Sequence, residues 1–540
     1  MPHAWQMTKC IGTSRILSNV NENTKPTISL KDCKVYGPGL SANFTVPVRY
    51  FFVQLLDIKQ QSFSSSPQSL TIQVSGLREK CRIWYQLLQI KEGLFIARYR
   101  LYETCLGIQI DIVYENQQIA EAPYIIEGTV FHEQCYCPKP LNEWLNNLNC
   151  PSSYPQIDRD LRLFSEINMR DVLEDALKRF NHPGSYSICH YSVVSNQVYR
   201  KCFGQYVGFS MFMDEILLSL TRKMYLPDME LIANLGDWPL EQRSDAENPI
   251  PIFSWCGSKS TKDIVMPTYD ITEATLEMMG RVMVDILSVM GNSGPSWEEK
   301  IQMGFWRGRD SRQERLDLVK LAREHPELIN ASLTNFFFFR KEEAEYGPKS
   351  EYISFFDFFK YRYQINIDGT VAAYRLPYLI AGGSLVLKQD SDFYEHFYND
   401  LQPMVHYVPF NRNLSNLVEK LQWAIDHDSE AKVIAENAQN FALSHLMPKD
   451  ILCYYAVLFK EYSKKLNSEN IHDDMEHVKQ PVQKSCLCPD EDKTASWENW
   501  HLELGFQLLR TFGLVRWGLE GSGHVEGTGE KLSFASQAAR

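Results

Sequence analysis

The spacing of apolar residues changes along this chain, and that change limits the folds it can adopt. Between residues 27 and 131, short segments alternate apolar and polar residues and are separated by Gly, Ser, Pro and Asn. This period-two pattern is typical of β-strands. Several short strands in one such region predict an immunoglobulin-like sandwich of two sheets. The clearest predicted strands cover residues 42–52, 70–74, 94–101 and 108–114.

A different pattern covers residues 161–465. Apolar strands alternate with helical stretches, which predicts parallel sheets joined by crossover helices. This length suits two Rossmann-like halves that face each other across a cleft, the arrangement called GT-B. The predicted strands include residues 230–235, 252–255 and 384–387, and the predicted helices include residues 212–224, 276–290, 312–324 and 414–426.

The remaining segments complete a multidomain α/β and all-β organisation. We expect an irregular N-terminal segment over residues 1–26, a connector with Cys and Pro over 132–160, and a poorly ordered polar tail over 466–540. A formal charge of -12 argues against a general nucleic-acid binder, which needs a basic face. No apolar run reaches about 18 residues, so no membrane span is predicted.

Thirteen cysteines are spread along the chain. Cys135 and Cys137 have a Cys-x-Cys spacing that fits a zinc site poorly, so disulfides in an oxidising compartment are the better interpretation. We expect a connector cysteine such as Cys137 to bond to Cys453, and Cys150 to bond to Cys135. The alternative is that Cys453 is a buried free thiol. Three glycosylation triplets are compatible with such a compartment, at Asn43, Asn330 and Asn413.

Residues 305–315 carry four arginines where a short apolar strand meets a helix, at positions 307, 309, 312 and 315. Gly308 would let the backbone approach a ligand closely. Helix N-terminal amides and guanidinium groups together could bind a diphosphate. The alternative is a solvated basic helix start, paired with Asp310 and Glu314.

Two further segments carry candidate site residues. Residues 226–239 end a strand in a Gly-Asp-Trp-Pro turn, where Asp237 could act as a general base or merely cap local amides. Residues 366–375 place small residues before Arg375, which could face a ligand or form a structural ion pair. Asp390 and Asp392 are the one metal candidate of the Asp-x-Asp type. A solvated acidic turn is the better interpretation there, so we expect a metal-independent mechanism.

Segments 234–239, 306–311 and 366–375 together resemble the Rumi-like, or capsule-associated-protein, glycosyltransferases. Segments 36–40, 93–99 and 119–124 resemble the filamin-type immunoglobulin repeat. The whole is similar to the KDEL-motif-containing protein O-glucosyltransferases over about residues 27–490. This resemblance implies transfer of glucose, with xylose as the alternative, from a UDP-sugar to a Ser of EGF-like repeats. It implies inversion at the sugar, and no cofactor besides the donor UDP-glucose.

The resemblance also implies roles for individual residues. Asp237 would be the catalytic base, and Arg309 and Arg315 would contact the nucleotide sugar, together with an aromatic contact near Tyr269. Main-chain groups of another segment would meet the uracil, at Pro326, Glu327, Leu328, Ile329 and Asn330. From the pattern of the residues themselves, the arginine cluster and the small-residue segment add further candidates, namely Arg307, Gly308 and Arg375.

The resemblance implies the lumen of the endoplasmic reticulum. Proteins of this family begin with a signal peptide and end with a KDEL-like tetrapeptide. Here residues 1–21 lack a compact apolar region, and the chain ends Ser-Gln-Ala-Ala-Arg540. The rival hypothesis is a catalytically inactive lumenal binding protein. Its filamin-type domain would bind extended peptides by strand addition.

Overall fold

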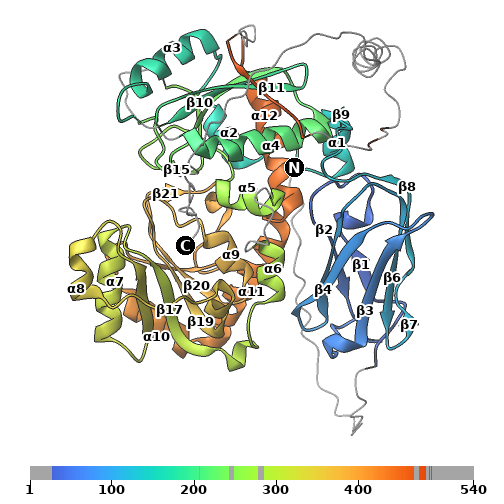
Figure 1. Cartoon of the computed structure of the whole chain (residues 1–540). Helices are drawn as coiled ribbons and strands as arrows, with labels where there is room; N and C mark the ends of the chain where they lie inside the picture. The colour runs from blue at the N-terminus through green and yellow to red at the C-terminus, as the bar shows by residue number, and fades with distance from the viewer. Residues whose placement is uncertain are drawn as a thin grey trace, which may run out of the picture.

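The computed structural model describes residues 27–185, 187–205, 207–242, 249–277, 285–467 and 474–481, together with Cys486 and Cys488. It contains a β-domain beside a larger α/β body that has two separate sheets (Figure 1). Within the described ranges, no helix is long and apolar enough to cross a membrane. The predicted irregular segment over residues 1–26 lies outside the described residues.

The β-domain is a sandwich of two antiparallel sheets, as the period-two pattern predicts. One sheet contains, in order, β1 (Lys34–Tyr36), β2 (Arg49–Gln54), β5 (Leu94–Leu101) and β4 (Ile83–Lys91). The other contains β3 (Leu70–Gly76), β6 (Cys105–Tyr114), β7 (Gln117–Gln118) and β8 (Tyr124–Val130). Phe51 and Val53 fill the space between the sheets, whereas the alternate residues Tyr50 and Phe52 join the core of the α/β body. Strand β2 is therefore buried on both faces.

Polar contacts also fix the β-domain on the α/β body. The guanidinium of Arg98 on β5 donates to the Ser288 hydroxyl at 2.9 Å. Ser288 lies on α6 (Ile286–Gly291), beside the Asp285 that caps this helix. Arg100 forms an ion pair with Glu277 at the end of α5 (Tyr269–Leu276). The single helix predicted over 276–290 was wrong, because α5 ends at Leu276, Glu277 after it is in a left-handed conformation, and α6 begins at Ile286.

The first sheet of the α/β body is mixed. Its order is β16 (Ile264–Val265), β14 (Ile252–Ser254), β13 (Met229–Asn234), β10 (Ile188–Val194), β11 (Gln197–Phe203) and β23 (Glu476–Val478). Strands β13, β14 and β16 run parallel, whereas β10 is antiparallel to both neighbours. The prediction of a parallel sheet holds for β13, β14 and β16 and was wrong for β10, β11 and β23. A tight hairpin turn at Ser195 and Asn196, both with positive φ, reverses the chain between β10 and β11.

The second sheet is entirely parallel, as predicted. Its order is β18 (Ile329–Asn335), β17 (Ile301–Arg309), β19 (Tyr361–Asn366), β20 (Leu385–Gln389) and β22 (Val408–Phe410). In chain order this is 2-1-3-4-5, the order of flavodoxin-like sheets. Connections and flanks include α7 (Gln313–Glu324), α8 (Glu343–Tyr346), α9 (Leu376–Ala381), α10 (Leu417–Asp426) and α11 (Asp428–His445). Ligands in such sheets bind where the strand order reverses, here between β17 and β19.

The predicted connector belongs to the core of the α/β body. Here β9 (Lys139–Pro140) pairs with β12 (Met224–Tyr225), and α1 (Leu141–Asn147) and α2 (Pro155–Leu161) pack against α12 (Pro448–Ser463). Trp144 of α1 and Ile157 of α2 share a hydrophobic cluster with Leu452 of α12. The first and last parts of the body are thus packed together. Two further helices, α3 (Met169–Phe180) and α4 (Ser210–Lys223), flank the first sheet.

Five disulfides lie within the described residues, and they correct the predicted pairing. Cys453 is bonded to Cys150, not to Cys137, because α1 carries the chain to α12. Cys135 and Cys137 are bonded to the two tail cysteines Cys486 and Cys488, respectively. Both of these bonds span 351 residues, so two Cys-x-Cys segments lie in matched register. The remaining disulfides are Cys81–Cys105 and Cys189–Cys202.

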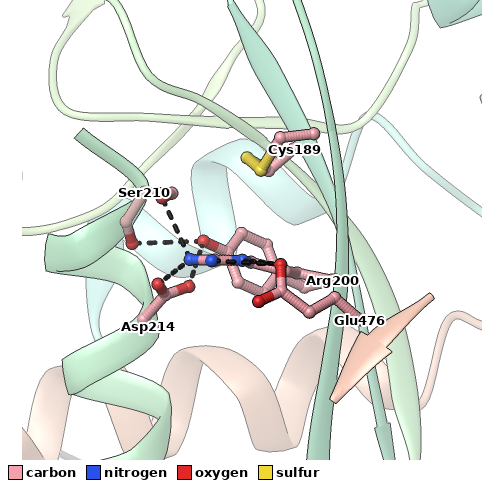
Figure 2. The surroundings of a disulfide bond; sticks show 7 residues. Cys189, Arg200, Ser210, Asp214 and Glu476 are labelled. Atoms are coloured by element: carbon pink, nitrogen blue, oxygen red, sulfur yellow. Dashed lines mark hydrogen bonds and ion pairs between the residues drawn. A yellow bond between two sulfur atoms is a disulfide. The ribbon is translucent and has the colours of Figure 1, made fainter. Parts of the chain in front are cut away.

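Part of the predicted polar tail is an integral strand. Strand β23 pairs with β11, and Glu476 on β23 forms an ion pair with the Arg200 guanidinium at 3.2 Å (Figure 2). Arg200 also pairs with Asp214 of α4, which accepts the Tyr191 hydroxyl at 2.8 Å. Burial raises the pKa of Asp214 to about 6. The expectation of disorder was therefore wrong for residues 474–481, while residues 489–540 lie outside the described residues.

Candidate active site

The carboxyl ends of strands from the two sheets meet at one junction. Strand β15 (Gly257–Ser258), which follows β14, pairs with β21 (Phe393–Tyr394), which follows β20. The ring of Trp238, just after β13, packs edge-on against Phe393 with centroids 5.5 Å apart. These contacts bring the loops after β13 and β14 to the loops after β17, β19 and β20. Ligands of open α/β sheets bind at such strand ends.

The loop after β13 is held by the side chain of Asn234. Its amide nitrogen donates to the Trp238 carbonyl at 2.7 Å and to the Ser254 hydroxyl at 3.0 Å. Its amide oxygen accepts the Gly236 N–H at 2.9 Å. One fully buried amide therefore closes the turn on both sides of Asp237.

A second buried group, Asp263, holds the other end of this loop. Its carboxylate accepts the N–H groups of Leu240 at 2.8 Å and Glu241 at 3.0 Å, and the Ser254 hydroxyl at 2.7 Å. Burial raises the pKa of Asp263, and these donors oppose that rise. The sequence reasoning missed Asp263 and Asn234, because main-chain N–H groups are partners that spacing does not reveal.

Asp237 lies half-buried at the tip of this loop. Its Oδ1 accepts the Tyr269 hydroxyl at 3.2 Å. Burial raises the pKa of Asp237, while the Tyr269 hydrogen bond and the positive charge of Arg309 lower it. A carboxylate whose pKa lies above its ordinary value accepts a proton more readily, which suits a general base.

Arg309 is the last residue of β17, in the second sheet. Its charge acts on both Asp237 and Tyr269. Its carbonyl accepts a hydrogen bond from Arg315, whereas no group among the described residues bonds to its guanidinium. A half-buried guanidinium with free donors at the point where the strand order reverses can bind a phosphate group.

Arg315 lies close by, but its side chain is engaged by the main chain. It donates to the carbonyls of Asp368 at 2.7 Å, Arg309 at 2.9 Å and Ile367 at 3.4 Å. Burial lowers the pKa of Arg315 to about 9. The structure therefore brings Arg315 to the predicted site, where it ties the loop after β19 to the end of β17. A direct contact with the nucleotide stays a prediction.

Arg375 and Arg307 also donate hydrogen bonds to carbonyl groups. Arg375 donates to the Arg307 carbonyl, and burial lowers the pKa of Arg375 to about 10, opposed by the charge of Asp270. Arg307 donates to the carbonyl of Asn330 at 2.9 Å and to its side-chain oxygen at 2.7 Å. The small residues before Arg375 pack against the buried thiol of Cys256. The positive charge of Arg375 therefore acts near Arg309 and Arg315, whereas the Arg307 guanidinium is engaged at Asn330.

Other predicted residues have different surroundings. A side chain at Gly308 would meet the Trp306 ring at 2.6 Å, so this glycine makes room for a tryptophan. Residues 326–330 lead into the start of β18, where Ile329 pairs with Gly304. Gly304 lies before Arg309 on β17, toward the amino ends of the parallel strands. Along β17 that separation is roughly 16 Å. Asn330 of this segment contacts one other predicted site residue, Arg307, through the two hydrogen bonds given above. The contact of the segment with uracil stays a prediction.

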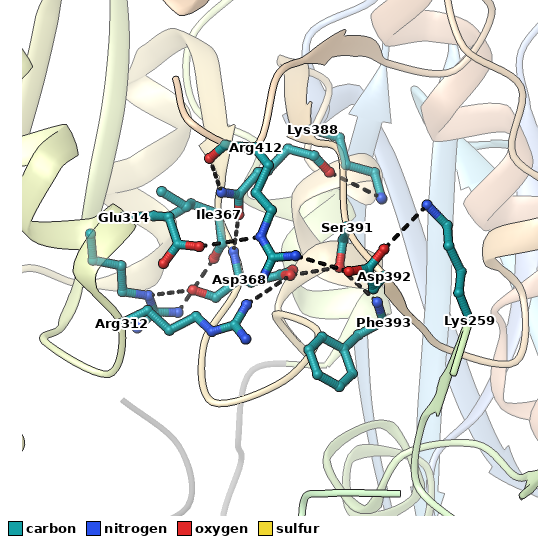
Figure 3. A network of polar contacts seen from close by, with 12 residues as sticks. Lys259, Arg312, Glu314, Ile367, Asp368, Lys388, Ser391, Asp392, Phe393 and Arg412 are labelled. Atoms are coloured by element: carbon teal, nitrogen blue, oxygen red, sulfur yellow. Dashed lines mark hydrogen bonds and ion pairs between the residues drawn. The ribbon is translucent and has the colours of Figure 1, made fainter. Parts of the chain in front are cut away.

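The alternative interpretation of the arginine cluster is a solvated basic helix start paired with Asp310 and Glu314. In the structure these two acidic residues have other partners. Asp310 accepts the N–H groups of Phe337 and Phe339, and Glu314 pairs with Arg412 at 3.4 Å. Figure 3 shows the surrounding polar network, which contains the ion pairs Arg312–Asp368, Lys259–Asp392 and Arg412–Asp392. Lys259 also pairs with Asp390 at 3.8 Å. Within the described part of the chain, no cluster of three or more His, Cys, Asp or Glu forms a candidate metal site.

A half-buried carboxylate and a guanidinium with free donors, contributed by the two sheets, are groups that could act on an anionic substrate. A model of glycosyl transferase family 90 matches residues 145–499. The chain belongs to this family.

Several curated proteins are similar over most of their length. Protein O-glucosyltransferase 2 of Danio rerio is 52% identical over 452 residues, which cover 83% of this chain and 90% of that protein. Protein O-glucosyltransferase 3 of Homo sapiens is 47% identical over 474 residues, which cover 86% and 93%. Protein O-glucosyltransferase 1 of Bos taurus is 30% identical over 328 residues, which cover 59% and 81%. The predicted resemblance to protein O-glucosyltransferases is confirmed.

Among solved structures, the Lin-41 filamin domain matches with 14% sequence identity and a TM-score of 0.17, covering 19% of this chain and 95% of that chain. A likeness of this size leaves the filamin-type assignment of the β-domain a prediction.

Proposed function

We propose that this chain transfers glucose from UDP-glucose to a serine hydroxyl of an EGF-like repeat, with inversion at the sugar. Family membership and relatives named protein O-glucosyltransferases support the reaction class. The observation that carries the proposal is the meeting of Asp237 with Arg309. The first group can accept a proton, the second can hold an anionic leaving group, and they come from different sheets.

In the proposed mechanism, Asp237 removes the proton of the acceptor serine. The serine oxygen bonds to C1 of the α-linked glucose from the face opposite to the nucleotide, and the bond between C1 and the diphosphate oxygen breaks. The product is a β-glucoside, and the transition state has oxocarbenium character. A positioned general base contributes about 100- to 10,000-fold to such a step.

The departing UDP gains negative charge as the bond breaks. Arg309 has free donors for that charge, and Arg315 and Arg375 hold two further cations nearby in a buried, low-dielectric position. We propose that these guanidinium groups neutralise the diphosphate and that transfer proceeds without a metal. The resemblance implies that Tyr269 contacts the donor sugar. In the structure its hydroxyl donates a hydrogen bond to Asp237.

We further propose a GT-B arrangement in which the two sheets are the two halves and their junction is the substrate cleft. The β-domain would be a filamin-type repeat that binds protein partners. The five disulfides among the described residues suit an oxidising compartment and support the lumen of the endoplasmic reticulum.

The full chain, produced in a secretory system, should be incubated with a folded EGF-like repeat and a panel of UDP-sugars. We expect UDP release, a mass gain of one hexose on a serine, sensitivity of the product to β-glucosidase, and activity that survives EDTA. UDP-xylose in the panel distinguishes the alternative donor. Neither UDP release nor sugar transfer with any donor would refute the proposal and favour the inactive binding protein.

A further inference from the structure

Tyr269 has no surface suited to a sugar contact. It begins α5 and only 7% of its surface is exposed. Aromatic rings enclose it, with centroids 5.1–5.8 Å away, namely those of Phe209, Phe212, Trp255 and Tyr374. Its hydroxyl group emerges from this enclosure and donates to Asp237.

The backbone beneath Tyr269 is also fixed. The Tyr455 hydroxyl donates to the Pro267 carbonyl at 2.9 Å, and the Tyr378 hydroxyl donates to the Asp270 carbonyl at 3.3 Å. Thr268 caps the start of α5. These contacts hold the chain on both sides of Tyr269, so neither its ring nor its backbone can shift freely.

We infer that Tyr269 is a positioning residue for the general base: its hydroxyl fixes the Asp237 carboxylate so that Oδ2 faces the acceptor. The inference rests on the proposed function, in which Asp237 accepts the serine proton. Only Oδ1 is engaged by a hydrogen bond among the described residues, which leaves Oδ2 for the acceptor. A general base must point a lone pair at the proton that it removes, and a displacement of about 1 Å can cost roughly 100-fold in rate.

The same hydrogen bond affects the titration of Asp237. Two groups act on the titration of Asp237, namely Tyr269 on α5 and Arg309 at the end of β17. Asp237 in turn acts on Tyr374 after β19 and on Cys256 after β14. Burial raises the pKa of Asp237, and Tyr269 and Arg309 lower it. Loss of the Tyr269 hydroxyl must therefore raise the pKa further. The fraction of active carboxylate then falls at acidic pH, and the acidic limb of the rate profile moves to higher pH.

Tyr269→Phe tests the inference because the ring and its packing are retained. We expect kcat to fall about 10- to 100-fold, with the KM for UDP-glucose and the affinity for UDP within about twofold of wild type. The acidic limb of the kcat profile should move to higher pH. The matched control is Tyr99→Phe on β5, which removes another buried tyrosine hydroxyl that donates to a main-chain carbonyl, that of Gly39 at 2.6 Å, but lies in the β-domain. It should keep wild-type kcat and pH dependence.

A second measurement does not depend on activity. Carboxyl-labelled aspartate should be titrated by ¹³C NMR, with the Asp237 signal assigned by its loss in Asp237→Asn. The pKa of Asp237 should be higher in Tyr269→Phe than in wild type, even if UDP-glucose proves not to be the donor. An unchanged pKa, or a raised KM for UDP-glucose with unchanged kcat, would overturn the inference. A fall in kcat with an unshifted pH profile would mean a purely structural role.

Discussion

The loop that carries Asp237 depends on the buried carboxylate of Asp263, and Asp263→Asn tests that dependence. Asp263 is 2% exposed and accepts three hydrogen bonds with its two oxygens. Asparagine has one acceptor oxygen, which can keep the bonds from Leu240 and Ser254. Its NH₂ group would then face the Glu241 N–H, so two donors would meet where a 3.0 Å hydrogen bond existed.

Hydrogen bonds to charged groups contribute about 1.5–3 kcal/mol. The substitution should therefore lower the free energy of unfolding by about 2 kcal/mol, and the melting temperature by roughly 4 °C for a unit of this size. A shifted loop should also misplace Asp237 and lower kcat about 10- to 100-fold. The affinity for UDP should stay unchanged, because Arg309 belongs to the other sheet.

Thermal melting, initial transfer rates and calorimetry with UDP measure these three quantities. The matched control is Asp228→Asn, since the exposed Asp228 also accepts a main-chain N–H, that of Ser195 at 2.8 Å, but lies at the amino end of β13. It should leave kcat at the wild-type value. If Asp263→Asn keeps both wild-type kcat and wild-type melting temperature, this carboxylate does not hold the loop. Equal losses in kcat and UDP affinity would also refute the reasoning.

Three further predictions follow from single side chains. Arg309→Ala should weaken UDP binding about 10- to 100-fold with little change in melting temperature. Arg315→Ala should also lower the melting temperature, because the Arg315 guanidinium donates to three carbonyls. Equal effects of the two variants in calorimetry and in thermal melting would contradict this. Glycopeptide mapping after secretory expression should find glycans on the exposed Asn43 and Asn413 but not on Asn330, whose side chain is bonded to Arg307 and Tyr361, and a glycan on Asn330 would be contrary evidence. Burial raises the pKa of Asp160 to about 7, above its unfolded value of about 4, so stability should fall as pH rises through that interval. Asp160→Asn should accordingly raise the melting temperature relative to wild type at pH 8 more than at pH 5, and an equal difference at both pH values would refute this.

Local patterns were sufficient to predict much of the fold. Strand β5 covers the residues 94–101 that alternation predicts, and the five-stranded parallel sheet follows from strands alternating with helices. The hairpin of residues 188–203 was missed because its turn at Ser195 and Asn196 contains no Gly. The disulfide partners were mispredicted because pairing depends on which distant segments pack together, as α1 does with α12.

The sequence was sufficient to predict which residues lie at the candidate site, but not what each side chain contacts there. The motifs locate Asp237 and Arg309, and the structure brings both to one junction. Spacing could not show that Arg315 binds the carbonyl of Asp368, 53 residues away. Nor could it show that the Trp306 ring fills the space beside Gly308. Tyr269 was predicted as a sugar contact, and only the three-dimensional arrangement shows its hydroxyl on the base.

The central claim is that Asp237 acts as the base while the arginines of the other sheet hold the nucleotide. The direct test compares Asp237→Asn with wild type for glucose transfer from UDP-glucose to an EGF-like repeat and for UDP affinity by calorimetry. We predict a loss of transfer of at least about 100-fold, with UDP affinity and melting temperature close to wild type. Retention of most of the transfer activity by Asp237→Asn would contradict the account.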